Sequence, residues 1–112
     1  MQTHTLLALS NPVEGREAEF NQWFDTVHIP EVRRVPGFAS VQRFEAAAHQ
    51  RIPGALPYRY LAQYELQTDD LEGTLQMLAQ AVQAGTKTQA SDATRRTLWV
   101  YSPLGPRRAA GS

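Results

Sequence analysis

Residues 58–82 read YRYLAQYELQTDDLEGTLQMLAQAV, a strand pattern that passes directly into a helix pattern. The first nine residues alternate at a period of two, which predicts a strand whose apolar face carries Tyr58, Tyr60 and Tyr64. Asp69 can cap the helix that follows, and Glu72 three residues later suits a capping box. The buried stripe of this helix is predicted to consist of Leu71, Leu75, Leu78 and Val82, with Gly85 ending it.

The same two patterns occur on the N-terminal side, in the same order. Residues 3–10 are short and largely apolar, which predicts a strand that turns at Asn11-Pro12. Residues 14–35 have helical periodicity, but Pro30 interrupts it. We therefore predict one helix to about Val27 and a second short turn that starts near Pro30.

The remaining segments complete the order of elements. Residues 38–45 alternate as a strand, with Phe38, Ser40, Gln42 and Phe44 predicted on one side. Residues 46–57 read as a loop, residues 86–94 as a polar connection, and residues 97–101 as the last strand. This order predicts an α+β fold, the ferredoxin-like βαββαβ sandwich with a four-stranded antiparallel sheet and two helices on one face. We expect a single domain over residues 1–104 and a flexible C-terminal tail over residues 105–112.

Both faces of the predicted sheet carry apolar or aromatic residues. Tyr64 and Leu61 fall on opposite faces of one strand, and Leu98 and Trp99 fall on opposite faces of another. Two helices can cover only one face of such a sheet. A second copy of the chain is the simplest cover for the other, so we expect a homodimer.

Composition excludes several kinds of chemistry and partner. Eleven basic and eleven acidic residues balance to a net charge of zero, which argues against nucleic acid or an anionic membrane as partner. The absence of cysteine rules out disulfides and thiolate nucleophiles. No segment approaches the roughly 20 apolar residues that span a bilayer, and no signal peptide is evident, so we expect a cytoplasmic protein. Phosphate-binding loops and serine-elbow motifs are absent, and we expect no cofactor.

The first predicted helix carries a resemblance to a known family. After the run from Asn11 to Glu17, an aromatic-x(4)-His-x-Pro segment extends from Trp23 to Pro30, and Pro36-Gly37-Phe38 and Tyr101–Leu104 follow later. These residues resemble the dimeric α+β barrel superfamily, and within it the EthD-like branch. The resemblance implies two sheets that form a barrel across a two-fold axis, with a cleft beside each sheet. Relatives include polyketide cyclases, muconolactone isomerase, cofactor-free quinol monooxygenases and haem-degrading enzymes, so the likeness restricts the position of a site more than its reaction.

His28 is the leading candidate for a catalytic group. It lies four residues after Phe24 at the end of the main helix, and its imidazole can exchange a proton near neutral pH. The alternative is a histidine that satisfies the carbonyls at the helix end. Asp25, three residues earlier, could orient the imidazole, or it could be a solvated charge.

Other candidates depend on which way their side chains point. His4 would be a second acid/base group if Leu6 and Ala8 face the cleft, and otherwise an exposed histidine at an edge. Arg43 could bind a substrate anion, or pair with a carboxylate on a neighbouring strand. The aromatic side chains could line a substrate pocket or simply pack in the core: Phe20, Trp23, Phe24, Tyr58, Tyr60 and Tyr64. The three histidines stand far apart, and no metal-ligand set is evident.

These residues lead to three functional hypotheses and a weaker fourth. The first is a small cofactor-independent enzyme of isomerase, cyclase or lyase type, which acts on an apolar or aromatic carbonyl or phenolic compound through proton transfer by His28. The second is a cofactor-free quinol-type monooxygenase. The third is a non-catalytic protein that binds a small molecule. Haem binding is the fourth, and a Soret band would reveal it.

Overall fold

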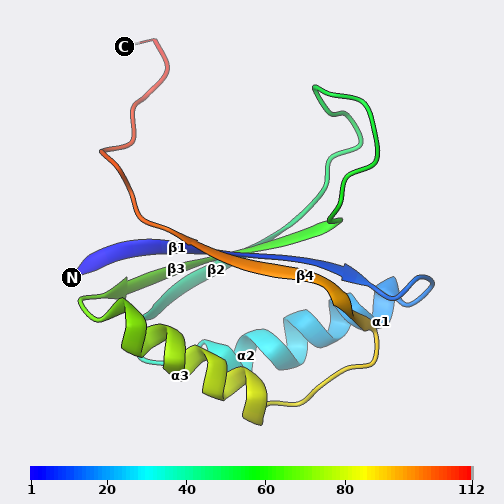
Figure 1. Cartoon of the computed structure of the whole chain (residues 1–112), viewed down its shortest axis with the longest axis horizontal. Helices are drawn as coiled ribbons and strands as arrows, with labels where there is room; N and C mark the ends of the chain where they lie inside the picture. The colour runs from blue at the N-terminus through cyan, green and yellow to red at the C-terminus, as the bar shows by residue number, and fades with distance from the viewer. Residues whose placement is uncertain (112) are drawn as a thin grey trace.

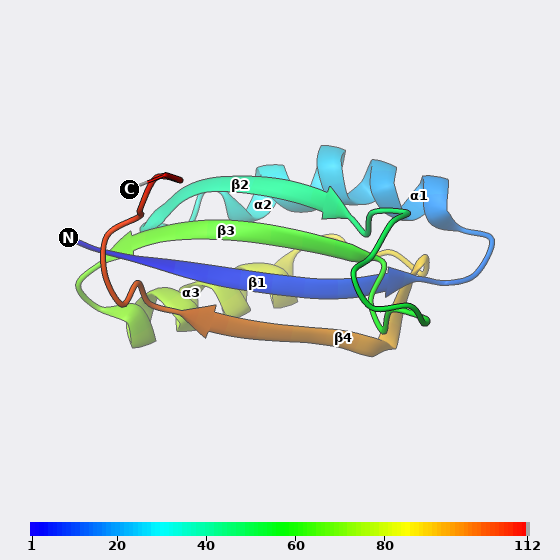
Figure 2. The ribbon, with the colours of Figure 1, turned by 90° about the horizontal axis from the view of Figure 1, so that it is seen from above.

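The computed structural model describes residues 1–111 and has one four-stranded antiparallel sheet with its helices on one face (Figure 1). The elements are β1 (Gln2–Pro12), α1 (Glu17–Trp23), the π-helical turn η1 (Phe24–His28), α2 (Ile29–Val32), β2 (Phe38–Glu45), β3 (Tyr60–Thr68), α3 (Leu71–Ala84) and β4 (Ser91–Tyr101). The strand order is β2-β3-β1-β4, which Figure 2 shows from above the sheet. The predicted ferredoxin-like βαββαβ sandwich is confirmed.

Strand β3 is central and has the predicted alternation. Every second side chain, from Tyr60 to Thr68, is buried. The prediction that Tyr58 shares this face is wrong, because the strand begins two residues later. Asn11 explains the late start: its side chain donates to the Pro57 carbonyl at 2.8 Å and accepts from the Arg59 amide at 2.7 Å. These backbone groups are therefore paired with a side chain, and Tyr58 lies in the loop, half-buried.

Strand β2 departs from strict alternation at its first residues. Phe38 pairs with Leu66 of β3, yet Ser40 pairs with Glu65, so one extra residue is accommodated between them. Such a bulge moves Phe38 to the other face of the strand. The prediction that Phe38 shares a face with Phe44 is therefore wrong. Phe38 faces the helices instead, with its ring 5.7 Å from that of Tyr64.

The first helical segment continues through Pro30, where an interruption was predicted. Proline has no N–H, and its ring collides with the carbonyl four residues earlier in an α-helix. The chain avoids this with a π-helical turn, in which the Ile29 amide donates to the carbonyl of Phe24, five residues earlier. The Arg33 amide then donates to Ile29 at 3.0 Å, so the helix resumes at once. His28 is the last residue of this turn.

The residue that caps helix α3 lies one position later than predicted. Asp70, rather than Asp69, caps it, because its carboxylate accepts from the Gly73 amide at 3.0 Å. Asp69 accepts instead from the Gln2 amide at 3.2 Å. Of the predicted stripe, Leu78 is buried, Leu71 and Leu75 are half-buried, and Val82 is exposed. The C-terminal end of α3 therefore leaves an apolar side chain uncovered.

Strand β4 is longer than predicted and begins at Ser91. Its early residues continue the pairing with β1, since Ser91 lies opposite Pro12 and the Val13 amide donates to the Ala90 carbonyl. The segment 105–111 has neither helix nor strand, and Ser112 of the predicted tail lies outside the described residues.

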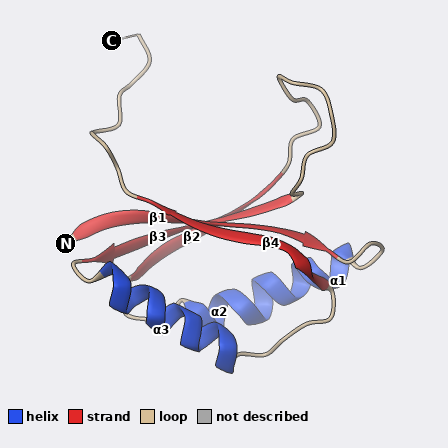
Figure 3. Ribbon diagram, viewed as in Figure 1, coloured by secondary structure: helices blue, strands red, loops and turns tan. Residues whose placement is uncertain are grey.

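The sheet has a covered face and an open face. All helices lie on one side, while the loop 46–59 and the C-terminal segment rise on the other (Figure 3). On the open face Phe44, Trp99 and Tyr101 are exposed, with Trp99 at 57%. The predicted apolar character of both faces is confirmed. Among residues 1–111, no helix has the length and hydropathy needed to cross a membrane.

Candidate active site

A cleft of about 960 Å³ opens between the helices and the covered face of the sheet. Its base is formed by alternate side chains of the two neighbouring strands β1 and β4, namely Leu6, Ala8, Leu98 and Val100. One wall is formed by α1 and η1, through Phe20, Trp23, Phe24 and His28. Helix α3 forms the other wall with Leu75, Leu78 and Val82. The lining is predominantly apolar, which suits a small organic molecule.

His28 lies on the aromatic wall of this cleft with its ring held on three sides. The imidazole stacks on Trp23, with ring centroids 4.9 Å apart, and meets the edge of Phe24 at 4.8 Å. Its Nε2 atom is 3.3 Å from the phenolic oxygen of Tyr64. Within residues 1–111 the structure gives no hydrogen bond to Nδ1.

The surroundings of His28 and Tyr64 favour the neutral form of both. Burial is the main cause that lowers the pKa of His28 below its ordinary 6.5; the charges of Lys87 and Arg43 add to the effect, and Glu31 opposes it. Burial raises the pKa of Tyr64 well above its ordinary value. At pH 7 the pair is therefore a neutral imidazole and a neutral phenol that share one hydrogen bond.

Asp25 does not lie beside His28, contrary to one prediction. Its carboxylate is 3.2 Å from the guanidinium of Arg43 and is 57% exposed. The i,i+3 proximity on which the prediction depended is a property of the α-helix, and both residues lie in the π-helical turn, whose residue spacing differs. Tyr64, 36 residues away in sequence, takes the place beside the imidazole.

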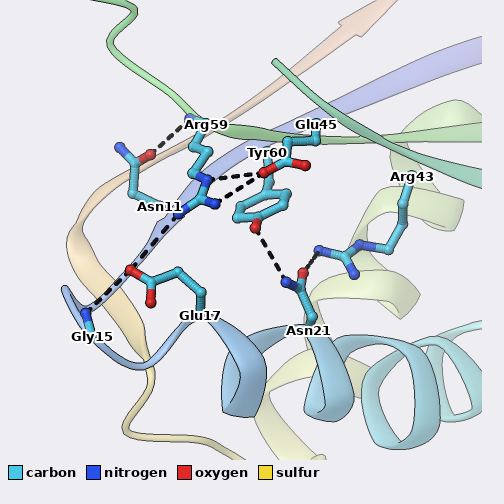
Figure 4. Close-up of polar contacts among 8 residues, drawn as sticks. All are labelled: Asn11, Gly15, Glu17, Asn21, Arg43, Glu45, Arg59 and Tyr60. Atoms are coloured by element: carbon cyan, nitrogen blue, oxygen red, sulfur yellow. Dashed lines mark hydrogen bonds and ion pairs between the residues drawn. The ribbon is translucent and has the colours of Figure 1, made fainter. Parts of the chain in front are cut away.

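Arg43 lies behind the aromatic wall and outside the cleft lining. It pairs with a helix carboxylate rather than with one on a neighbouring strand. Its guanidinium donates to Asn21 at 2.8 Å and lies over the Phe24 ring at 4.4 Å. Asn21 in turn donates to the Tyr60 hydroxyl at 3.2 Å, as Figure 4 shows. This arginine therefore joins β2 to the helical segment that carries His28.

His4 and Tyr60 share the covered side of the sheet but do not line the cleft. His4 is buried, and its Nδ1 atom is 2.7 Å from the Ser102 hydroxyl. Tyr60 packs against Phe20, with ring centroids 5.7 Å apart. The structure brings His28, Tyr64 and the three aromatic side chains of α1 and η1 to the cleft, and it places His4, Tyr58, Tyr60, Asp25 and Arg43 elsewhere.

Polar residues at the mouth of the cleft were not predicted from the sequence. The Trp23 indole donates to the Thr86 carbonyl at 2.9 Å, and the Glu31 carboxylate accepts from the Thr86 amide at 3.1 Å. Lys87 donates to carbonyls at the end of α3, including that of Gln83 at 2.9 Å. Arg96 of β4 also lines the cleft. The sequence predicted β4 too short to include Arg96. A longer strand would have placed Arg96 on the same face as Leu98 and Val100, because side chains alternate along a strand.

Metal-ligating side chains do not gather in the described part of the chain. Among residues 1–111, no group of three His, Cys, Asp or Glu side chains is placed to hold a metal ion.

The chain was compared with family models, with curated sequences and with solved structures. No family model and no curated sequence matches. The haem-degrader MhuD from Mycobacterium tuberculosis, solved with two haems in its active site, is 15% identical with a TM-score of 0.62 over 94% of this chain and 99% of its own. A putative monooxygenase from Shewanella loihica is 19% identical with a TM-score of 0.57 over 94% and 97%.

An ethyl tert-butyl ether D (EthD) family protein from Bacillus halodurans is also similar. It is 15% identical, with a TM-score of 0.53 over 93% of this chain and 100% of its own. At such identities the likeness shows the fold, and it extends over nearly the whole of each chain. The chain therefore shares the fold of these proteins, and an EthD family protein is among them.

Proposed function

We propose that this chain is a cofactor-independent enzyme that moves a proton on a small apolar or aromatic carbonyl or phenolic compound, with His28 as the base. One observation carries the proposal: a neutral imidazole, held by Tyr64, lies on the wall of an apolar cleft. A base whose pKa lies below 6.5 is deprotonated at neutral pH and ready to accept a proton.

The proposed mechanism uses one of the two tautomers that the hydrogen bond to Tyr64 allows. When Nε2–H donates to the phenolic oxygen of Tyr64, Nδ1 carries the free electron pair. Nδ1 then takes a proton from the carbon next to a substrate carbonyl, and the electrons of the C–H bond move into an enolate. Return of the proton to a different carbon completes an isomerisation. Attack by the enolate carbon on a second carbonyl of the same molecule, whose oxygen then takes the proton back from His28, gives a cyclisation. Tyr64 stabilises the imidazolium formed between these steps.

The aromatic wall accounts for the class of substrate. Trp23 and Phe24 present ring faces and edges next to His28, and Phe20 extends the wall. The cleft volume of about 960 Å³ lies near the upper end for drug-sized ligands. A flat molecule of one to several rings would bury most of its surface there, without support from a metal or a phosphate-binding loop.

Oxygenation is the second candidate function, and it begins with the same step. Removal of a phenolic proton by His28 gives an electron-rich phenolate, which can pass electrons to O₂ without a cofactor. The indole of Trp23, stacked on His28, would hold such a ring beside the base. The structural likeness to a putative monooxygenase supports oxygenation, and this candidate function is as well supported as proton transfer.

Haem is a further candidate ligand of the cleft. Haem iron needs an axial His, Tyr, Cys or Met, and among the described cleft residues only His28 and Tyr64 are of these types. The two side chains are hydrogen-bonded to each other through Nε2 of His28, so His28 would ligate the iron through Nδ1, the atom that the proposed mechanism uses as the base. Titration with haemin tests this: a stoichiometric Soret band would support haem as the ligand and contradict a cofactor-independent reaction, and its absence would support the proposal.

One set of assays separates the candidates. Deuterium uptake by 2-tetralone in D₂O reports proton transfer, and O₂ consumption with 1,4-naphthohydroquinone reports oxygenation. We expect His28→Gln to lose the activity while 2-tetralone still binds. His4→Gln is the matched control, because His4 is buried outside the cleft. Binding without turnover in the unmodified protein would favour a non-catalytic binding protein.

We also propose that the open sheet face pairs with a second copy of the chain. Trp99 and Tyr101 are more than half exposed there, and Phe44 lies on the same face. An apolar surface of this kind on a sheet is characteristic of a subunit interface. The loop 46–59 and the C-terminal segment rise from the sheet on this side (Figure 1), and would contact the partner at its edges.

A further inference from the structure

Arg96 lines the cleft, carries a positive charge and has no role in the proposed proton transfer. It lies on β4 directly opposite Ser10 of β1, and alternates with Leu98 and Val100. All four residues line the cleft, so the Arg96 side chain is on the covered side of the sheet. It is exposed, and within residues 1–111 no carboxylate lies within ion-pair distance of it.

The other charged groups of the cleft are already engaged by the backbone. Glu31 accepts from the Thr86 amide, and Lys87 donates to the carbonyls of Val82 and Gln83. Lys87 has one N–H left, whereas no hydrogen bond or ion pair of the Arg96 guanidinium occurs within residues 1–111, so all of its donors are left for a ligand. A guanidinium recognises a carboxylate through two parallel hydrogen bonds.

We infer that the cleft takes an amphipathic substrate, with an apolar or aromatic body against the Trp23–His28 wall and a carboxylate held by Arg96. This inference rests on the proposed function of the cleft and adds the class of substrate to it. The apolar surface that such a body would cover is present: Leu98, on the same strand, is 64% exposed, and Val82 faces it from α3.

The strand register sets the length of this substrate. Tyr64, which holds His28, lies opposite Leu6 of β1, whereas Arg96 lies opposite Ser10. Four residues of a strand correspond to roughly 14 Å, and the extended side chain of Arg96 can shorten the gap by several ångströms. The carboxylate and the reacting atom should therefore be separated by two or more fused rings, or by one ring and a short chain.

Isothermal titration calorimetry with a matched pair of probes tests the inference. 1-Pyrenebutyrate has a carboxylate at the end of a short chain, and 1-pyrenebutanol is its neutral analogue. We expect the unmodified protein to bind the carboxylate roughly tenfold or more tightly, as a charge-assisted hydrogen bond predicts. Arg96→Gln should abolish this preference while the alcohol still binds, and Arg96→Lys should keep part of it.

Arg95→Gln is the matched control, because Arg95 lies on the same strand, points to the other side, and donates to the Pro57 carbonyl at 3.0 Å. It should leave the preference unchanged. A preference that survives in Arg96→Gln, or that is absent from the unmodified protein while the alcohol binds, overturns the inference and leaves the proposed function standing. Failure of both probes to bind would overturn both.

Discussion

Replacing Arg43 by methionine should destabilise the fold more than any other change of a charged residue outside the cleft. The guanidinium side chain is only 17% exposed, yet it donates to Asn21 at 2.8 Å and covers the Phe24 ring at 4.4 Å. Methionine keeps much of the aliphatic packing but removes the donors and the charge. The link between β2 and the π-helical turn would be lost.

The expected loss in the free energy of unfolding is estimated from three contacts of Arg43. The hydrogen bond from a charged donor to Asn21 contributes about 1.5–3 kcal/mol. The contact with the Phe24 ring contributes about 0.5–2 kcal/mol. The pair with Asp25, whose carboxylate is 57% exposed, adds about 0–1 kcal/mol. Because these terms are not additive, we expect a loss of about 2–4 kcal/mol, or roughly 10–20 °C in Tm.

Urea unfolding at a fixed protomer concentration measures this loss, since stability depends on concentration if the chain dimerises. Arg43→Lys should recover only part of it, because an ammonium cannot reproduce the planar fork. Asp25→Asn is the control and should cost less than about 1 kcal/mol. The reasoning is refuted if Arg43→Met is as stable as the unmodified protein, or if Asp25→Asn costs as much.

Three further predictions follow from the structure. Asp70→Ala should cost about 1 kcal/mol in urea unfolding through loss of the α3 cap, and Asp69→Ala clearly less. Trp99→Lys on the open sheet face should convert a dimer to a monomer in analytical ultracentrifugation; Leu98→Gln, which faces the cleft, should not. The pKa of His28 is lower in the folded chain, so the unfolded chain takes up a proton at a higher pH than the folded chain does. The free energy of unfolding should therefore fall as the pH drops through about 6.5, and level off below the pKa of the folded chain. Urea unfolding of His28→Gln should show a weaker fall over that range.

Local patterns carried most of the fold prediction, and they failed where one residue broke the pattern. The alternation of β3 is readable from the sequence because Tyr60, Ala62, Tyr64 and Leu66 stand at every second position. The bulge after Phe38 could not be read, because an extra residue leaves no mark in a short strand whose polar and apolar residues are mixed. Pro30 predicts a break, because proline in a sequence does not distinguish a helix that ends from one that continues through a π-helical turn.

The candidate site was predicted in part for a similar reason. His28 and its aromatic neighbours are close in sequence, and helical periodicity placed them together. Its partner Tyr64 is on β3, and only the packing of that strand under the helix decides which tyrosine of the stripe reaches the imidazole. Arg96 was missed because the early residues of β4 are polar, and polar residues at a strand edge resemble a loop.

The most direct test of the account is the pKa of His28 in the folded protein. The ¹³Cε1 and ¹⁵N shifts of the histidines, assigned with His4→Gln and His49→Gln, can be followed by NMR between about pH 4.5 and 8. We expect a midpoint below 6.5 for His28, with the neutral ring at pH 7 and its Nε2 bonded to Tyr64. A midpoint at or above 6.5, unchanged in Tyr64→Phe, would contradict it.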